Sequence, residues 1–395
     1  MNILQLTNYP TSNPQHGGQL RSNHFAKEMR KSGFNVKSLA VYVERDYEPD
    51  SEDDIPFGEE SSFWNSDLHF LSDYLTGLFA AEDEKALAAI AQIANSYSID
   101  VIICEHPWLM AAAAKVAADR PGTRLVYSSH NVEFRLKRGV LKKSDVPRNE
   151  CDRLVAAIEN LELEATTCAD LVITCTQADA EYYRTNAPNT KIVVAGNGVE
   201  PFSCKPDRVE SWRRFIGLPF PAFVSSAHFP NAAGFWDMLA PGLTFLRPEE
   251  KVLVVGGVSD LITQMKGFDE YGMLNRNRME VMGRMDKSEL QAVLSAAHVI
   301  LLPIVEGEGS NLKTAEALEA GCSIVATSKA FRGFEQAMNL PQVHIADDSI
   351  SFRRKVRQIL DAPRFTKGTP SEIRSQFHWH YLLRDAVAQI GALGR

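Results

Sequence analysis

Two short apolar runs constrain the fold of this chain more than any other feature. VILLPI occupies residues 299–304, and SIVAT occupies residues 323–327. Runs of this length that are rich in branched apolar residues are typical of buried strands. Gly307 and Gly309 follow the first run and predict a tight loop. Apolar residues at helical spacing fill the rest of the interval, so the segment predicts a strand, a glycine loop, a short helix and a second strand.

The predicted helix carries an unusual charge near its start. Ser310 or Asn311 is a suitable N-cap, and Gly321 is a suitable end. Lys313 in the first turn opposes the helix dipole, but beside a glycine loop it adds to an anion site made of backbone N–H groups. Glu316 lies one turn further on the same face. A cation for phosphate and a carboxylate for sugar hydroxyls suit a nucleotide-sugar pocket. An exposed Lys–Glu pair on a surface helix is the alternative.

The composition is that of an ordinary globular protein. The chain has 395 residues, of which 45% are hydrophobic and 23% are charged, and this length predicts two domains. The net charge of −8 disfavours non-specific nucleic-acid binding. Six scattered cysteines without a CxxC spacing disfavour a zinc site or a disulfide framework and predict a reducing compartment. With no signal-like start and no apolar stretch of membrane length, the sequence predicts a cytoplasmic protein.

Strands and helices are predicted to alternate through both halves of the chain. The first half opens with a strand at residues 2–7, a helix at 19–31 and a strand at 35–43, which is how a doubly wound sheet begins. Gly17 and Gly18 precede that first helix, where small residues let a ligand approach the backbone, although a plain flexible turn is the simpler interpretation. The second half repeats the alternation from residue 222.

One histidine lies where α/β sheets place ligands. The strand predicted at residues 125–128 is followed by Ser129, His130 and Asn131. The carboxyl end of a central parallel strand is the edge at which such sheets bind ligands. His130 is therefore a candidate site residue, with a capped loop histidine as the alternative.

Two charged segments stand out in the first half. Residues 44–67 hold ten acids and almost no bases, and they predict a solvated loop or insertion. Residues 134–143 (FRLKRGVLKK) hold five bases interleaved with apolar residues. This basic segment suits contact with an anionic acceptor or a membrane surface, and a mobile basic loop is the equally weighted alternative.

The pattern around the glycine loop resembles the donor-site signature of retaining glycosyltransferases of the GT-B fold, the large family four (group 1-like). Glu308 and Glu316 are separated by seven residues and are followed by Ala317-Leu318 and, after Gly321, by IVAT. The resemblance implies that Glu316 holds the ribose hydroxyls of the donor, that Lys313 faces its diphosphate and that Glu308 contacts the donor sugar.

The same resemblance implies further site residues. His130, followed by Asn-Val-Glu as in the family, would lie over the donor sugar near the acceptor. Gly283 and Arg284 would frame the nucleobase. The glycines before the first helix would face the cleft between domains. Donor contacts are also implied for the residues of the loop that precedes Lys313, namely Gly309, Ser310 and Asn311. The phosphate-binding arginine of many relatives has no evident counterpart here.

The resemblance implies a GT-B architecture of two doubly wound Rossmann-like domains facing a cleft. The acceptor-side domain would span residues 1–198, with a C-terminal helix at 376–395 packing back on it, and the nucleotide-sugar domain would span 199–375. The implied reaction transfers a sugar from a UDP- or GDP-sugar to an acceptor glycan, lipid-linked saccharide or other glycoconjugate, with retention and without a metal or other cofactor. Polysaccharide biosynthesis is the usual setting.

Two rival functions stay open at this point. One is a sugar-nucleotide epimerase or hydrolase of the same fold, which would need no acceptor. The other is a non-catalytic GT-B-like subunit that supports a partner enzyme. The basic segment at residues 134–143 also leaves open a peripheral location at the inner face of the membrane.

Overall fold

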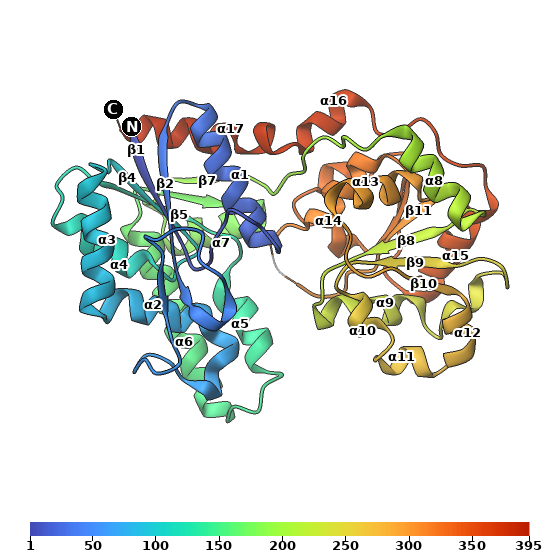
Figure 1. Ribbon diagram of the computed structural model, residues 1–395, viewed down its shortest axis with the longest axis horizontal. Coiled ribbons are helices and arrows are strands. Elements are labelled where there is room, and N and C mark those ends of the chain that lie inside the picture. Colours follow the sequence, from blue (N-terminus) through green and yellow to red (C-terminus); the bar gives the residue numbers. More distant parts are fainter. Residues whose placement is uncertain (308, 395) are drawn as a thin grey trace. The chain divides into compact units, whose positions relative to one another are not determined.

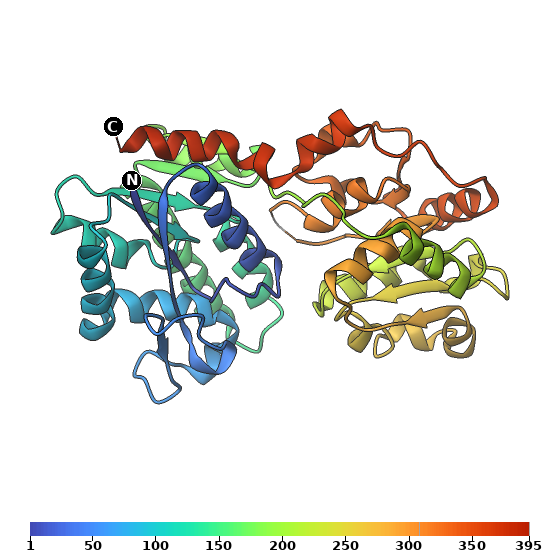
Figure 2. The same ribbon diagram turned by 45° about the horizontal axis from the view of Figure 1, so that its top comes forward.

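The structure is a computed structural model that describes residues 1–307 and 309–394, and within these the chain divides into two compact units (Figure 1). The first unit comprises Met1–Gly196 and the chain from Leu382 onward, and the second comprises Asn197–Tyr381. Each unit is a parallel sheet with helices on both faces (Figures 1 and 2). The chain is therefore an α/β protein with two Rossmann-like domains.

The sheet of the first unit is parallel throughout and has the order β3-β2-β1-β4-β5-β6-β7. Its strands are β1 (Asn2–Thr7), β2 (Asn35–Val43), β3 (Ile55–Phe57), β4 (Val101–Glu105), β5 (Arg124–Ser128), β6 (Leu171–Thr174) and β7 (Ile192–Val194). The strand order reverses direction between β1 and β4. At such a point, the loops after the two neighbouring strands run in opposite directions. They leave a crevice at the carboxyl edge, where sheets of this kind bind ligands.

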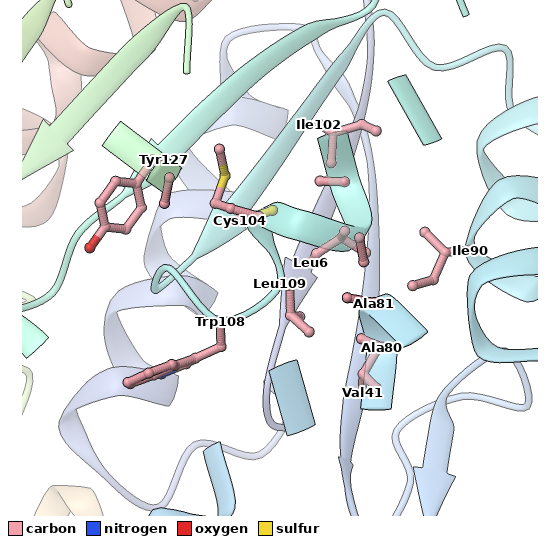
Figure 3. Packing of buried hydrophobic residues seen from close by; sticks show 14 of the residues in the cluster. Leu6, Val41, Ala80, Ala81, Ile90, Ile102, Cys104, Trp108, Leu109 and Tyr127 are labelled. Atoms are coloured by element: carbon pink, nitrogen blue, oxygen red, sulfur yellow. The ribbon is translucent and has the colours of Figure 1, made fainter. Parts of the chain in front are cut away.

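Helices cover both faces of this sheet. They are α1 (Gly17–Lys31), α2 (Ser72–Glu82), α3 (Glu84–Ser96), α4 (Met110–Ala118), α5 (Glu133–Leu141), α6 (Arg148–Cys168), α7 (Gln177–Asn186) and the C-terminal α17 (Trp379–Leu393). Figure 3 shows the core on one face, where strand residues such as Leu6, Val41 and Ile102 point toward Ile90 of α3. Helix α17 (red in Figure 2) packs on this unit, because Gly391 lies against the ring of Phe34.

Two segments are more ordered than the sequence predicted. The acidic segment contains strand β3 and the short 3₁₀ helix η1 (Glu44–Asp46), and a second 3₁₀ helix, η2 (Ser66–Leu71), begins at its end, so the segment is not only a solvated loop. Phe57 of β3 is buried and stacks on Phe79 at a centroid distance of 4.5 Å. A three-residue strand that contains proline is too short for periodicity to reveal. The basic segment forms helix α5, because Phe134 and Leu141 are buried in the core while most bases stay outside.

The sheet of the second unit is also parallel and has the order β10-β9-β8-β11-β12-β13. Its strands are β8 (Pro221–Val224), β9 (Val252–Val255), β10 (Met279–Val281), β11 (Val299–Leu302), β12 (Ser323–Ala326) and β13 (Val343–Ile345). Successive residues of each central strand face opposite sides: Leu253 joins one buried cluster, and Val252 and Val254 join the other. Both faces are covered, which explains the continuous apolar runs in the sequence.

The helices of the second unit are α8 (Pro206–Ile216), α9 (Phe229–Leu239), α10 (Ser259–Ile262), α11 (Lys266–Asp269), α12 (Gly272–Asn277), α13 (Lys287–Ala296), α14 (Leu312–Ala320), α15 (Ser349–Asp361) and α16 (Ser371–Arg374). The short 3₁₀ helices are η3 (Leu243–Phe245), η4 (Ser328–Phe331), η5 (Glu335–Ala337) and η6 (Ser375–Phe377). Within the residues described, none of the helices is both long and apolar enough to cross a membrane.

Candidate active site

The glycine loop and helix predicted from the sequence are present in the second unit. Strand β11 leads into the loop, α14 follows, and β12 comes directly after it. Of the two candidate N-caps, Asn311 has the extended backbone of a cap, and its side-chain oxygen accepts a hydrogen bond from the Lys313 N–H at 3.2 Å. Gly321 ends the helix in the left-handed conformation, with φ 72°. The local sequence signals therefore predicted this segment correctly.

Arg332 holds the glycine loop in its observed shape. Gly307 and Gly309 have φ values of 120° and 65°, which favour glycine. The Arg332 Nε donates to the Gly309 carbonyl at 2.9 Å, and its guanidinium also donates to the Gly307 carbonyl. Ser310 Oγ accepts a hydrogen bond from the Asn197 N–H at 3.3 Å. The predicted donor residue Glu308 lies outside the described residues.

Lys313 and Glu316 lie together near the start of α14, and both are partly buried. No side-chain hydrogen bond or ion pair of either residue occurs within residues 1–307 and 309–394. Burial lowers the pKa of Lys313, opposed by the nearby Glu316 charge. Burial also raises the pKa of Glu316, opposed by the charges of Lys313 and Lys287. The two charges are therefore poorly compensated, and a ligand that carries phosphate and hydroxyl groups would satisfy both.

The loops after β9 and β10 form the other part of this sheet edge. Gly256 follows β9 with φ 100°, and a Cβ there would lie 2.2 Å from the carbonyl oxygen of Ser225. Its N–H donates to the Gly283 carbonyl at 2.6 Å, while Gly283, with φ 66°, donates its own N–H to Ser259 Oγ. The Arg284 side chain is exposed. Glycine thus allows these two strand ends to approach closely, at the edge to which the α14 loop also belongs.

In the first unit, His130 is tied to a buried carboxylate. Its Nε2 lies 2.8 Å from Glu105 Oε2, and Gln5 donates to the other Glu105 oxygen at 2.7 Å. Burial alone would raise the pKa of Glu105, but hydrogen bonds, chiefly the one from His130, lower it. Burial, and then the neighbouring His106, lower the pKa of His130 to about 3. An ionised carboxylate only accepts hydrogen bonds, so a neutral His130 carries its proton on Nε2 and has Nδ1 as an acceptor.

A second histidine lies beside the first. His106 follows β4 with φ 74°, which is unusual for a residue other than glycine. Its Nδ1 lies 2.9 Å from Glu133 Oε1, and its Nε2 lies 3.1 Å from the hydroxyl of Tyr9. Its ring centroid is 4.0 Å from that of His130. His106 was not among the residues predicted for the site, although an acid followed by a histidine at the end of the apolar run VIIC was the available signal.

The glycine pair predicted to precede the first helix forms its first two residues instead, at the same sheet edge. Gly17 is the first residue of α1, and its N-cap is His16. A Cβ at Gly18 would lie 2.7 Å from the Tyr9 hydroxyl and 3.4 Å from a ring carbon of His16. The small residue at Gly18 therefore makes room for the tyrosine that contacts His106.

A pocket of about 580 Å³ lies in the first unit among the residues after β3 and the starts of α2 and α6. Its lining includes the aromatic residues Phe63, Trp64 and Tyr74, together with Glu150 and Arg153. The last two form an ion pair at 2.6 Å. Aromatic surface with nearby polar groups is suited to a sugar ring. Within the described residues, no cluster of three or more histidine, cysteine or acidic side chains is arranged to hold a metal ion.

Two protein-family models match the chain in succession. A glycosyl transferase 4-like domain matches residues 16–198, and a glycosyl transferases group 1 domain matches residues 223–362. Together they span most of both units. The chain belongs to the group 1, family-four-like glycosyltransferases, and its two Rossmann-like domains have the GT-B fold.

Solved structures of low sequence identity share this fold across their whole length. HepE from Anabaena, in complex with UDP, is 16% identical with a TM-score of 0.64, and the match covers 99% of this chain and 100% of that one. Sucrose-phosphate synthase from Thermosynechococcus elongatus is 16% identical with a TM-score of 0.69, covering 100% and 98%. An α,α-trehalose-phosphate synthase (UDP-forming) from Burkholderia xenovorans, in complex with glucose-6-phosphate, is 13% identical with a TM-score of 0.65, covering 100% of both chains. A search of curated protein sequences gave no match.

Proposed function

We propose that this glycosyltransferase moves a sugar from a nucleoside-diphosphate sugar to a glycan, lipid-linked saccharide or other glycoconjugate, with retention at the anomeric carbon. The observation that carries the proposal is the partly buried pair Lys313 and Glu316 at the start of α14, whose side chains have no hydrogen-bonding partner within residues 1–307 and 309–394. UDP-sugars are the first donors to test, because the structure of HepE is that of a complex with UDP and the trehalose-phosphate synthase is described as UDP-forming. GDP-sugars are the alternative donors.

The donor half of the proposal assigns one task to each group. Lys313 and the N-terminus of α14 stabilise the negative charge that grows on the departing diphosphate. Glu316 accepts hydrogen bonds from the ribose hydroxyls and fixes the nucleotide. The backbone at Gly283 and Arg284 borders the base, and Glu308 contacts the donor sugar. Ser310 and Asn311 belong to the phosphate-facing loop, and Arg332 keeps that loop in shape.

The acceptor half is assigned to the first unit. His130 accepts a hydrogen bond from a sugar hydroxyl at Nδ1, because Nε2 is already engaged by Glu105. Glu105 and Glu133 each hold a histidine and so do not form the nucleophile and acid/base pair of a retaining glycosidase. The proposed mechanism is therefore leaving-group stabilisation without a metal ion or other cofactor.

The acceptor is proposed to lie over the carboxyl edge of the first sheet. The pocket with Trp64 and Tyr74 supplies aromatic surface for a saccharide. Helix α5 adds basic side chains, among which Arg138 and Lys142 suit an anionic acceptor such as a lipid-linked phosphosaccharide. A cytoplasmic enzyme in peripheral contact with a membrane would meet such an acceptor.

Thermal unfolding with a panel of nucleoside diphosphates tests the donor site. A ligand present at 100 times its dissociation constant stabilises the folded state by about 2.7 kcal/mol. Stabilisation by one diphosphate is expected for the wild-type protein and should be lost in Lys313→Ala and in Glu316→Ala. Lys329→Ala and Glu270→Ala, at exposed positions of the same unit, are the matched controls and should keep the shift. Absence of a shift with every nucleotide would contradict the proposal.

A further inference from the structure

A buried carboxylate on helix α6 caps helix α5 from outside. Helix α5 begins at Glu133, and its N-cap, Val132, provides no capping side chain. The fully buried Glu162 takes over this role. Its Oε1 accepts the Glu133 N–H at 2.8 Å, and its Oε2 accepts the Phe134 N–H at 3.2 Å. First-turn N–H groups carry partial positive charge, so a carboxylate at this position stabilises the start of the helix.

The same carboxylate anchors a chain of hydroxyl groups that reaches the preceding loop. Tyr183 Oη lies 2.5 Å from Glu162 Oε1, and Tyr127 Oη lies 3.2 Å from it. Tyr183 Oη also reaches the Asn131 carbonyl at 3.3 Å and Ser129 Oγ at 2.9 Å. The Ser129 hydroxyl donates to the same Asn131 carbonyl at 2.8 Å. The backbone between β5 and α5 is therefore held at both of its ends by one buried network.

This loop positions both histidines of the candidate site. His130 lies within it, and the side chain of Glu133 at its end holds His106. Glu162 contacts neither histidine, but it holds the backbone on which both depend. We propose that Glu162 is a positioning residue that fixes His130 and the His106–Glu133 pair through its contacts with the start of α5. The proposal rests on the proposed function of this site.

The protonation state of Glu162 affects how firmly it holds the loop. Tyr127 of β5, Tyr182 and Tyr183 of α7 and Glu133 of α5 are the titratable groups that surround it. Burial, with a smaller contribution from the Glu133 charge, raises the pKa of Glu162 to about 7, although the hydrogen bond from Tyr183 lowers it. The ionised form accepts two N–H and two hydroxyl donors, whereas the protonated form must donate from one oxygen. The loop is therefore held most firmly above pH 7.

Although the carboxylate caps α5, its ionised form is less favourable in the folded protein than its protonated form, because the cost of burial outweighs these hydrogen bonds. The native pKa of Glu162, about 7, exceeds its unperturbed value of 4.5, so between these values the folded state binds the extra proton. The contribution of protonated Glu162 to the stability of the folded state is therefore complete below pH 4.5 and is lost as the pH rises through 7. If Glu162 served stability alone, its replacement by glutamine should cause no loss of activity at high pH. A positioning role predicts that Glu162→Gln is at least as stable as wild type at high pH yet less active.

The experiment compares wild type, Glu162→Gln and the exposed control Glu164→Gln on the same helix. Ring ¹⁵N resonances of His106 and His130, read by histidine-selective NMR, should shift with a midpoint near pH 7 in wild type and in the control. This step should vanish in Glu162→Gln. With UDP-glucose and GDP-mannose as probes, kcat of wild type should rise through the same midpoint. At high pH, Glu162→Gln should lose roughly five- to tenfold in kcat at unchanged KM for the donor.

Two results would overturn the inference. One is an unchanged pH dependence of the histidine resonances in Glu162→Gln. The other is a loss confined to donor KM, which would place the effect in nucleotide binding. Failure of every protein form to turn over either sugar nucleotide would instead count against the proposed function, and the NMR comparison would still decide whether Glu162 controls the loop. A melting curve for each variant at high pH separates misfolding from mispositioning.

Discussion

The imidazole rings of His106 and His130 have centroids 4.0 Å apart, with their planes at 38°, and each ring is bound to a different glutamate. His106 pairs with Glu133 of helix α5, and His130 pairs with Glu105 of strand β4. Because burial lowers the pKa of His130 to about 3, that ring is neutral at pH 7 and the two rings pack without repulsion between like charges. This arrangement lies at the carboxyl edge of β4 and β5, where we propose that the acceptor binds.

Replacing His130 should impair turnover while leaving nucleotide binding intact. His130→Ala removes the Nδ1 acceptor and leaves Glu105 with one fewer hydrogen-bond donor. We expect kcat to fall by about 10- to 100-fold, equivalent to about 1.4–2.7 kcal/mol. Steady-state kinetics and UDP calorimetry measure the two effects separately. The exposed His69→Ala is the control, and a loss of UDP affinity in His130→Ala equal to the loss of kcat would contradict the assignment.

Replacing Lys313 should weaken the transition state more than it disturbs the fold. Loss of one charge-assisted contact to the leaving diphosphate is expected to cost about 2–3 kcal/mol of transition-state stabilisation in Lys313→Met. Because burial already lowers the pKa of Lys313, removing the charge should leave the melting temperature unchanged or slightly higher. The measurement is kcat/KM beside a melting curve. A variant that loses stability and activity in parallel would indicate a structural role.

Gly256 should not tolerate a side chain. A Cβ there would lie 2.2 Å from the Ser225 carbonyl oxygen, and the residue has φ 100°. Gly256→Ala should therefore destabilise the second unit by about 2–4 kcal/mol, since both strain and a steric clash are introduced. Gly272→Ala is the matched control, because nothing lies within 4 Å of a Cβ at that helical position. It should be neutral or stabilising by about 0.5–1 kcal/mol. Urea denaturation would distinguish the two.

The ion pair between Glu250 and Arg357 should make stability depend on acidic pH. Two Arg357 nitrogens lie 2.5 and 3.0 Å from the Glu250 carboxylate. Burial alone would raise the pKa of Glu250, but the Arg357 hydrogen bonds and charge lower it. The ion pair therefore stabilises the folded state at pH values above the pKa of Glu250 in the unfolded chain, near 4.5. This stabilisation is lost as the pH falls through the lower pKa of Glu250 in the folded protein. Arg357→Met should cost about 1–3 kcal/mol at pH 7 and much less at acidic pH, measured by denaturant titration.

The parts of this structure that depend on local sequence were predicted correctly. The loop and helix that carry Lys313 follow from a buried run, two glycines and the cap Asn311, all within one short segment. The doubly wound order follows from strands that alternate with helices. Strand β3 was missed because it is too short to show periodicity.

The groups that were missed act across long distances in the sequence. Arg332 reaches back to the Gly309 carbonyl, and Glu162 reaches the start of α5 from another helix. An acid on an amphipathic helix normally indicates a solvated face, so no local pattern marks Glu162 as buried. His106 lay at a recognisable strand end, but its partner Glu133 comes from a different element. Such contacts become visible only when the fold brings the elements together.

Calorimetric titration of UDP, uridine and 2′-deoxy-UDP into wild type, Lys313→Ala and Glu316→Ala tests the central claim most directly. The account assigns the diphosphate to Lys313 and the ribose to Glu316. Lys313→Ala should therefore lower the affinity for UDP by at least about tenfold, since a charge-assisted hydrogen bond contributes about 1.5–3 kcal/mol. Its affinity for uridine should be unchanged. Glu316→Ala should lower the affinities for UDP and for uridine to the same extent, and its affinity for 2′-deoxy-UDP should be close to that of wild type. Equal affinities of all three proteins for UDP would contradict the placement of the donor at the start of α14.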